Sequence, residues 1–204
     1  MRLSFLFEAC LQGPYIHTKE SGDFRLVREG GRLFLFFPHS DGKEDWQNNL
    51  DFPAVAFGEG GERLFAHRGF VRVWEALAPH VLPSVLDVRT KDVTVVGYSH
   101  GGALAVLCYE AILRARPSFA HRLTGVGFGA PRVLWGARRR RINERFRHFT
   151  VVRNAGDAVT HLPPALLGYY HAGKLLTVGE AGKYSAIDAH RPENILAELK
   201  KYEE

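Results

Sequence analysis

Hydrophobic residues in this chain gather in short runs, and these runs alternate with longer amphipathic segments. The clearest run is 92–96, whose β-branched residues are typical of a strand buried on both faces of a sheet. A helical pattern follows at 103–114. Strands that alternate with helices in this way predict an α/β fold with a mostly parallel central sheet and helices on both faces. The expected strands are 24–28, 32–37, 52–57, 63–66, 92–96, 121–128, 148–152 and 174–178, and the expected helices are 70–86, 103–114, 137–146 and 191–201.

Turn residues refine this outline. Glu-Gly-Gly at 29–31 separates the first two strands and a glycine-rich stretch at 58–61 separates the next two, so each pair is expected to form a hairpin. Pro79 and Pro83 fall inside the helical pattern at 70–86, and they are expected to kink or divide that helix.

The composition is that of a globular protein. Of the 204 residues, 46% are hydrophobic and 24% are charged, so we expect one α/β domain spanning 1–204. No apolar run approaches the roughly 20 residues of a membrane-spanning helix. The apolar stretch at 3–7 is shorter than the core of a signal peptide, roughly 7–15 residues, which makes a cytoplasmic location the expectation. Cys10 and Cys108 are expected to be free thiols.

The strand at 92–96 leads directly into the pattern Gly-x-Ser-x-Gly, formed by Gly97, Ser99 and Gly101. This pattern is typical of a sharp turn between a strand and a helix that exposes a nucleophilic serine. Side chains two residues before or after the serine would crowd the neighbouring strand and helix, which explains the glycines. The turn also directs the first N–H groups of the helix towards the reacting oxygen. Ser99 is therefore the candidate nucleophile.

A serine hydroxyl needs a base to remove its proton and an acid to hold that base. In folds with this turn, the acid and then the histidine follow the serine along the chain. Asp157 is the favoured acid because it follows the end of an expected strand, with Asp188 as the alternative. His190 is the favoured base because it lies downstream of nearly all other elements, with His171 as the second choice.

Several linked segments resemble the class 3 lipase family, the fungal-type triacylglycerol lipase group within the α/β hydrolases. The resemblance spans roughly residues 32–195. Its motifs appear in the order that the family has them, which is more specific than any single motif. The matching segments are Phe37-Pro38-His39-Ser40 with 45–50, 66–70, 95–105, 128–133, 152–164 and 168–173.

The resemblance implies an α/β-hydrolase fold and a set of residue roles. Ser99, Asp157 and His190 match the nucleophile, the acid and the base of the family, and His171 falls in a segment that does not supply the base. The backbone N–H groups of Ser40 and His100 match the two donors that bind the oxyanion. The reaction that the family carries out needs neither a metal nor a cofactor.

Three departures from the family pattern change the picture of the pocket. Pro38 and His39 replace the family's Arg and Gly before Ser40, so His39 is either a substrate contact or a solvated loop residue. His100 replaces the commoner leucine, and its ring either lines the pocket or packs. The lid segment 41–49 is short and polar, with Trp46 as its one large apolar residue, so we expect weak interfacial activation.

The net charge of +5 permits an anionic partner, and the most basic stretch is Arg138-Arg139-Arg140-Arg141. This run is either a solvated helix face or a patch that associates weakly with anionic lipid surfaces. Nucleic acid is not expected as a partner, because no nucleic-acid-binding motif accompanies the run.

These observations predict a serine hydrolase that cleaves the carboxylic esters of lipids, of the mono-, di- or triacylglycerol type or with short to medium chains. Alternatives on the same triad are a phospholipase, a small-ester esterase and an acyltransferase. A catalytically silent lipid-binding relative is an alternative of another class.

Overall fold

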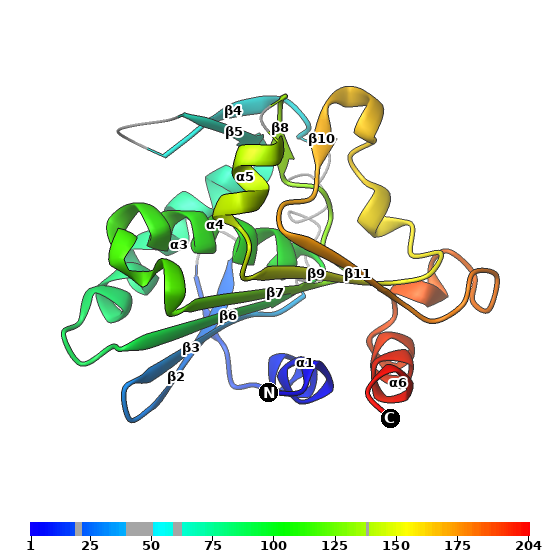
Figure 1. The fold of residues 1–204 in the computed structure, drawn as a ribbon, viewed down its shortest axis with the longest axis horizontal. Coiled ribbons are helices and arrows are strands. Elements are labelled where there is room, and N and C mark those ends of the chain that lie inside the picture. Colours follow the sequence, from blue (N-terminus) through cyan, green and yellow to red (C-terminus); the bar gives the residue numbers. More distant parts are fainter. Residues whose placement is uncertain (19–21, 40–50, 59–62, 138) are drawn as a thin grey trace.

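A seven-stranded sheet forms the centre of the computed structural model, which describes residues 1–18, 22–39, 51–58, 63–137 and 139–204 (Figure 1). The strand order is β1-β2-β3-β6-β7-β9-β11, and neighbouring strands from β3 to β11 are parallel. The antiparallel strands β1 and β2 complete one edge, so the expected mostly parallel sheet is confirmed. The strands are β1 (Ile16–His17), β2 (Asp23–Glu29), β3 (Arg32–Phe37), β6 (Asp92–Tyr98), β7 (Leu123–Phe128), β9 (Phe149–Asn154) and β11 (Lys174–Val178).

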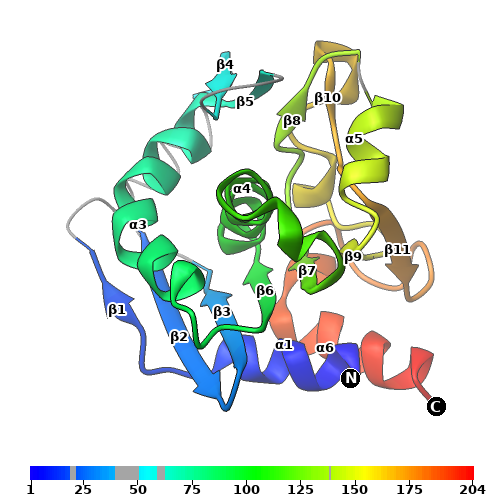
Figure 2. The same ribbon diagram turned by 60° about the vertical axis from the view of Figure 1, so that its left-hand side comes forward.

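Helices cover both faces of this sheet (Figures 1 and 2). Strand β3 shows why its apolar run is continuous: successive side chains of a strand point to opposite faces. Leu33 and Leu35 join the hydrophobic cluster under α3 and α4, whereas Phe34 and Phe36 join the cluster under α1 and α6. The helices are α1 (Leu3–Leu11), α3 (Arg68–Leu86), α4 (His100–Ala115), α5 (Arg139–Arg145) and α6 (Pro192–Tyr202), with short 3₁₀ turns η1 (Pro117–His121), η2 (Val159–His161), η3 (Ala165–Leu167) and η4 (Asp188–His190).

A second, smaller sheet lies to one side of the main sheet (Figure 2). Its order is β10-β8-β5-β4, and its pairs are antiparallel. The β4–β5 hairpin agrees with the sequence prediction. The sequence does not predict β8 and β10, because each has two residues and each pairs with a segment distant in the chain. The strands are β4 (Ala54–Phe57), β5 (Leu64–His67), β8 (Leu134–Trp135) and β10 (Tyr169–Tyr170).

Helix α3 corrects the expectation that Pro79 and Pro83 divide it, because it runs as one helix through both prolines. Both prolines are exposed, whereas Leu77, Val81 and Val85 on the other face are buried. Each proline removes one helical hydrogen bond, but the carbonyl oxygens released on an exposed face are open to water. Burial of the apolar face therefore keeps the helix in one piece.

Helix α1 was not expected from the sequence. Its Phe7 is fully buried, and the ring lies 4.5 Å from the ring of Phe128 and 5.3 Å from that of Tyr98. This contact places α1 against the sheet, directly behind the strand that ends at the candidate nucleophile. Within the described residues, no helix is both long enough and apolar enough to cross a bilayer. Cys10 on α1 and Cys108 on α4 are buried free thiols, as expected.

Candidate active site

Ser99 occupies a strained turn between β6 and α4. Its φ of 55° and ψ of −120° make it the one residue other than glycine with a positive φ in the described parts of the chain. Such a conformation costs of the order of 1–3 kcal/mol and persists only where the surrounding structure enforces it. The turn places Ser99 directly beyond the carboxyl end of β6, where the residue is 6% exposed rather than open to solvent.

The two glycines of the pattern are required by backbone contacts. A Cβ on Gly97 would lie 2.0 Å from the carbonyl oxygen of Gly101, and a Cβ on Gly101 would lie 2.1 Å from that of Phe37. No side chain fits at either distance, and the obstacle is backbone that cannot move aside. The sharp turn at Ser99 therefore depends on glycine at both positions.

His190 lies in η4, and its ring reaches Ser99 from the far end of the chain. The Nε2 atom of His190 lies 2.8 Å from Oγ of Ser99. The His190 side chain is 15% exposed, which leaves the ring shielded while a reacting group can still approach. The two residues are 91 positions apart, so only the folded chain brings them together.

Asp157 completes the arrangement from the turn that follows β9. Its Oδ2 atom lies 2.9 Å from Nδ1 of His190, and its Oδ1 atom accepts a hydrogen bond of 2.9 Å from the backbone N–H of Val159. The carboxylate is fully buried. A Cβ on Gly129 would lie 2.8 Å from the ring of His190 and 3.3 Å from Oδ2 of Asp157, so this glycine allows the pair to approach closely.

These contacts define one protonation pattern. A neutral His190 with its proton on Nδ1 donates to Asp157, and its Nε2 then accepts the Ser99 O–H. In this tautomer the lone pair that removes the serine proton faces the serine. The geometry is therefore that of an activated nucleophile, a base and an orienting acid.

Two further residues hold η4 in place, and the sequence reasoning missed both. The hydroxyl of Tyr98 donates to the carbonyl oxygen of His190 at 2.7 Å, and its ring stacks on that of His190 with centroids 5.4 Å apart. Asn154 donates to the carbonyl oxygen of Ala189 at 3.1 Å. Tyr98 could have been noticed from its place directly before Ser99. The role of Asn154 depends on a contact across 35 residues and left no local signal.

The oxyanion candidates are only partly within the described structure. His100 begins α4, where the first N–H groups of a helix have no acceptor within the helix. Its ring is buried, 5.2 Å from that of Phe70, so the side chain packs against α3. His39 is exposed, with its ring 5.5 Å from that of Tyr98. Ser40 and Trp46 lie outside the described residues.

The alternative acid and base are occupied elsewhere. Asp188 accepts a hydrogen bond from Ser185 and pairs with Arg191 at 2.9 Å. The Nε2 atom of His171 lies 2.8 Å from the carbonyl oxygen of Thr160. Neither side chain is part of the hydrogen-bonded chain that joins Ser99, His190 and Asp157.

His171 makes the stability of the fold depend on pH. Burial lowers the pKa of its imidazole to about 4, although the Thr160 carbonyl favours the charged form. In the unfolded chain the pKa is about 6.5, so protons bind the unfolded state first as the pH falls. The contribution of His171 to the free energy of unfolding is fully present above pH 6.5. It is lost as the pH falls towards 4, and the loss amounts to about 3 kcal/mol. We expect His171→Gln to reduce this loss, measured as the free energy of unfolding in urea at a series of pH values. If the variant shows the same dependence of this free energy on pH as wild type, His171 is not its cause.

A family model described as "Lipase (class 3)" matches residues 34–167 of the chain. A lipase from Rhizomucor miehei is 28% identical over 148 residues, which cover 70% of this chain and 40% of the relative. A lipase from Caenorhabditis elegans is 31% identical over 140 residues, which cover 69% of this chain and 36% of the relative. The aligned part is thus two fifths or less of the length of these curated relatives.

Solved fungal lipases share the architecture. A fungal lipase in complex with an inhibitor aligns with a TM-score of 0.72 at 21% identity, covering 86% of this chain and 78% of that one. A triacylglyceride lipase from Rhizomucor miehei aligns with a TM-score of 0.67 at 23% identity, covering 81% and 66%. These alignments confirm the predicted α/β-hydrolase fold.

Proposed function

Since this chain belongs to the class 3 lipase family, we propose that it hydrolyses carboxylic ester bonds of lipids through an acyl-serine intermediate. The observation that carries the proposal is the unbroken hydrogen-bonded chain from Ser99 through His190 to Asp157. It lies at a strained turn at the end of a parallel strand, the position at which a nucleophilic serine is typical of this motif.

The proposed reaction has two halves. In the first, His190 takes the proton of Ser99 as Oγ attacks the ester carbonyl carbon, and it then passes that proton to the leaving alcohol. In the second, water attacks the acyl-serine, His190 takes the proton of that water and returns it to Oγ, and the carboxylic acid leaves. Asp157 stabilises the positive imidazole in both halves. Its burial strengthens this interaction, because the pair is shielded from water.

The negative oxygen of each tetrahedral intermediate needs hydrogen-bond donors. We assign this role to the backbone N–H groups of Ser40 and His100, which match the family pattern by position. His100 is supported by its place at the first turn of α4, where the helix dipole favours negative charge. The loss of one such donor typically lowers the rate by roughly 10²–10³-fold.

The substrate class is the finer part of the proposal. One Rhizomucor miehei structure is by its name that of a triacylglyceride lipase. For the present chain we propose esters of the mono-, di- or triacylglycerol type or of short to medium chain length. The short polar lid expected at 41–49 favours monoacyl, diacyl or short-chain esters over emulsified long-chain fat; this segment lies outside the described residues.

A chain-length series tests the proposal. We expect hydrolysis of p-nitrophenyl esters from acetate to palmitate with an optimum at short to medium chains, together with rapid labelling by a fluorophosphonate. Higher activity on phosphatidylcholine than on acylglycerols would favour a phospholipase, and ester transfer to an added alcohol would favour an acyltransferase. Absence of both labelling and hydrolysis would leave the catalytically silent lipid-binding alternative.

The arginine run gives a second, weaker element of the proposal, association with anionic lipid surfaces. Arg139, Arg140 and Arg141 are exposed on α5, while Arg138 lies outside the described residues. Of the exposed residues, Arg140 pairs with Glu144 at 3.6 Å. Attraction of about 1 kcal/mol per basic residue near an anionic membrane is typical.

A further inference from the structure

Four large apolar side chains are exposed together on η3 and the small sheet. We call Phe65, Trp135, Leu166 and Leu167 the leucine–aromatic face. Leu166 is 97% exposed and Leu167 53%, at the tip of η3. Phe65 and Trp135, each 41% exposed, are paired neighbours on β5 and β8 with ring centroids 5.9 Å apart. Clustered exposure of this kind is unusual on a protein that stays in water and marks an interaction site.

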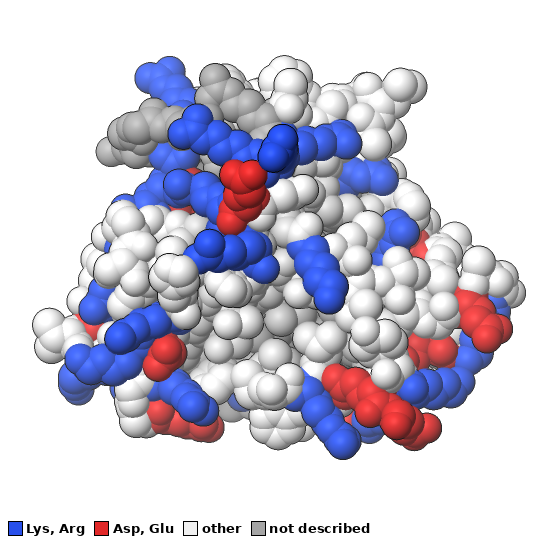
Figure 3. Space-filling model, viewed as in Figure 1, with Lys and Arg blue, Asp and Glu red and all other residues white. Residues whose placement is uncertain are grey.

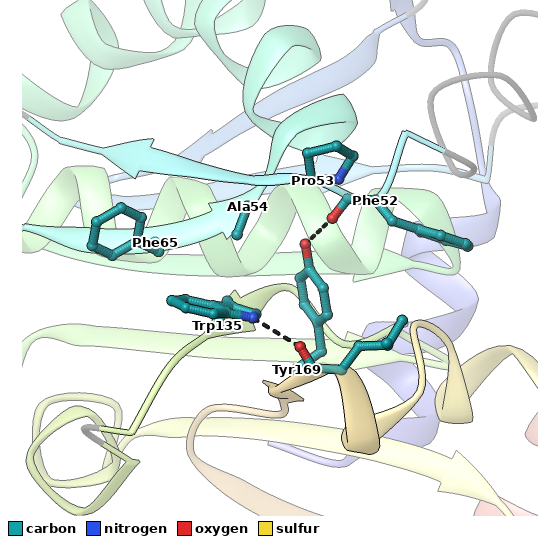
Figure 4. Close-up of a pocket in the computed structure, with 7 residues that line it drawn as sticks. Phe52, Pro53, Ala54, Phe65, Trp135 and Tyr169 are labelled. Carbon is teal, nitrogen blue, oxygen red and sulfur yellow. Dashed lines mark hydrogen bonds between the residues drawn. The ribbon is translucent and has the colours of Figure 1, made fainter.

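A hollow of about 490 Å³ lies within this face (Figure 4). Phe65, Trp135 and Leu167 line it together with Phe52 and Pro53, which precede β4, and with Ala54 and Tyr169 of the small sheet. Two of the lining side chains, Trp135 and Tyr169, carry a polar group, and each of these groups already donates a hydrogen bond to the backbone. The Trp135 N–H donates to the Leu167 carbonyl oxygen at 2.8 Å, and the Tyr169 hydroxyl donates to the Phe52 carbonyl oxygen. The hollow therefore suits a hydrocarbon group better than a polar ligand.

Positive charge borders the leucine–aromatic face on one side. The guanidinium of Arg139 lies 5.0 Å from the ring centre of Tyr170, which belongs to the small sheet. Figures 1 and 2 both place α5 beside β8 and β10, and Figure 3 shows basic side chains gathered over this part of the molecule. Helix α5 carries Glu144 as its single acidic residue among seven. An apolar face with a basic border is complementary to an anionic membrane, whose hydrocarbon lies behind negative headgroups.

A buried layer of rings separates this face from the candidate active site. The rings of Phe52 and Tyr169 lie 5.7 and 5.9 Å from that of His67. His67 in turn stacks on Phe70 at 4.3 Å, and Phe70 contacts the His100 ring at 5.2 Å. Changes at the exposed tip of η3 should therefore leave the chemistry at Ser99 intact.

We propose that the leucine–aromatic face docks the protein on anionic lipid bilayers, with Leu166 and Leu167 entering the acyl region and Arg139 and Arg140 meeting the headgroups. The docking surface contains no residue of the lid segment, and the inference rests on the proposed function, because the bilayer would supply the lipid esters that the triad hydrolyses. Burial of one leucine side chain strengthens membrane binding by roughly 10-fold or more, and one interfacial arginine by about fivefold.

Sedimentation with vesicles tests the docking surface. On vesicles of phosphatidylcholine mixed with anionic phosphatidylglycerol, the Leu166→Ser/Leu167→Ser variant should bind at least roughly 10-fold more weakly than wild type. Arg139→Gln/Arg140→Gln should lose affinity at low salt and differ less at high salt. The matched control is Val88→Ser, at a valine that is 79% exposed on the turn after α3, and it should bind as wild type does.

Hydrolysis of soluble p-nitrophenyl butyrate separates the two proposals. We expect all these variants to keep wild-type rates on this ester. Vesicle binding without any hydrolysis by wild type would overturn the proposed function and leave the docking surface standing. Equal vesicle binding by the double-serine variant and wild type would overturn the docking surface. If the double-serine variant lost a dimer in gel filtration but kept its vesicle binding, the docking surface would also be overturned, because the face would then join two copies of the chain.

Discussion

Replacing Ser99 with alanine is expected to lower the rate of ester hydrolysis by roughly 10⁴–10⁶-fold, because the attacking oxygen is lost. Alanine keeps a Cβ at φ 55°, so the strain of the turn and the fold are retained. The measurement is kcat on p-nitrophenyl butyrate, with fluorophosphonate labelling as a second readout that should disappear. Ser118→Ala, at an exposed serine of η1, is the control and should keep wild-type activity. Residual activity above a few per cent would point to a different nucleophile.

Asp157→Asn tests the hydrogen bond between Asp157 and His190, the second one in the series that joins Ser99, His190 and Asp157. An asparagine N–H can donate to Nδ1 of His190, which would place the ring proton on Nε2, facing Ser99. The base would then hold the wrong tautomer, and a loss of roughly 10⁴-fold in kcat is expected with little change in KM. An unchanged kcat would show that the carboxylate does not orient the base.

The strand-to-helix turn could be predicted from the sequence because its determinants are local. A run of β-branched residues, two glycines around a serine and a helical pattern lie within about twenty positions. The same holds for β3 and β11, whose observed bounds coincide with the predicted ones. Strand β3 is buried on both faces, so its hydrophobic run is continuous and easy to recognise, whereas β11 is a largely exposed edge strand recognised from its short run of strand-forming residues.

Features set by long-range contacts could not be predicted. Helix α1 has no distinctive pattern, and its place depends on the contact of Phe7 with Phe128 of β7 on the same face of the sheet. Strands β8 and β10 have two residues each, which is too short for a recognisable sequence pattern, and they are strands only because they pair with other strands in the folded chain. The contacts of Tyr98 and Asn154 that hold η4 depend likewise on long-range packing, because these residues end β6 and β9, which lie on either side of β7. Ser99 was predicted from its local motif, whereas Asp157 and His190 were predicted from the order of the three residues along the chain, since their spacing gives no information about their distance in space.

Helix α5 and its arginines depend on one buried carboxylate that the sequence does not single out. Glu110 on α4 is fully buried, and its Oε1 atom accepts a hydrogen bond of 2.7 Å from Arg114, one turn later. Arg145 at the end of α5 reaches the same carboxylate with Nε at 2.8 Å and Nη2 at 2.9 Å. A carboxylate buried in this way persists only because both guanidinium groups compensate its charge.

Glu110→Ala is therefore expected to lower the free energy of unfolding by about 3–5 kcal/mol, because it removes the buried carboxylate that the Arg114 and Arg145 guanidinium groups both contact. For a chain of this size the melting temperature should fall by roughly 6–20 °C, measured by calorimetry or circular dichroism. The matched control is Glu144→Ala, which removes a carboxylate of α5 whose pair with Arg140 is open to water, and its effect should stay below about 1 kcal/mol. Equal shifts for the two variants would mean that the buried pair contributes no more than a surface one, and that α5 is held by the packing of Ile142 and Phe146 instead.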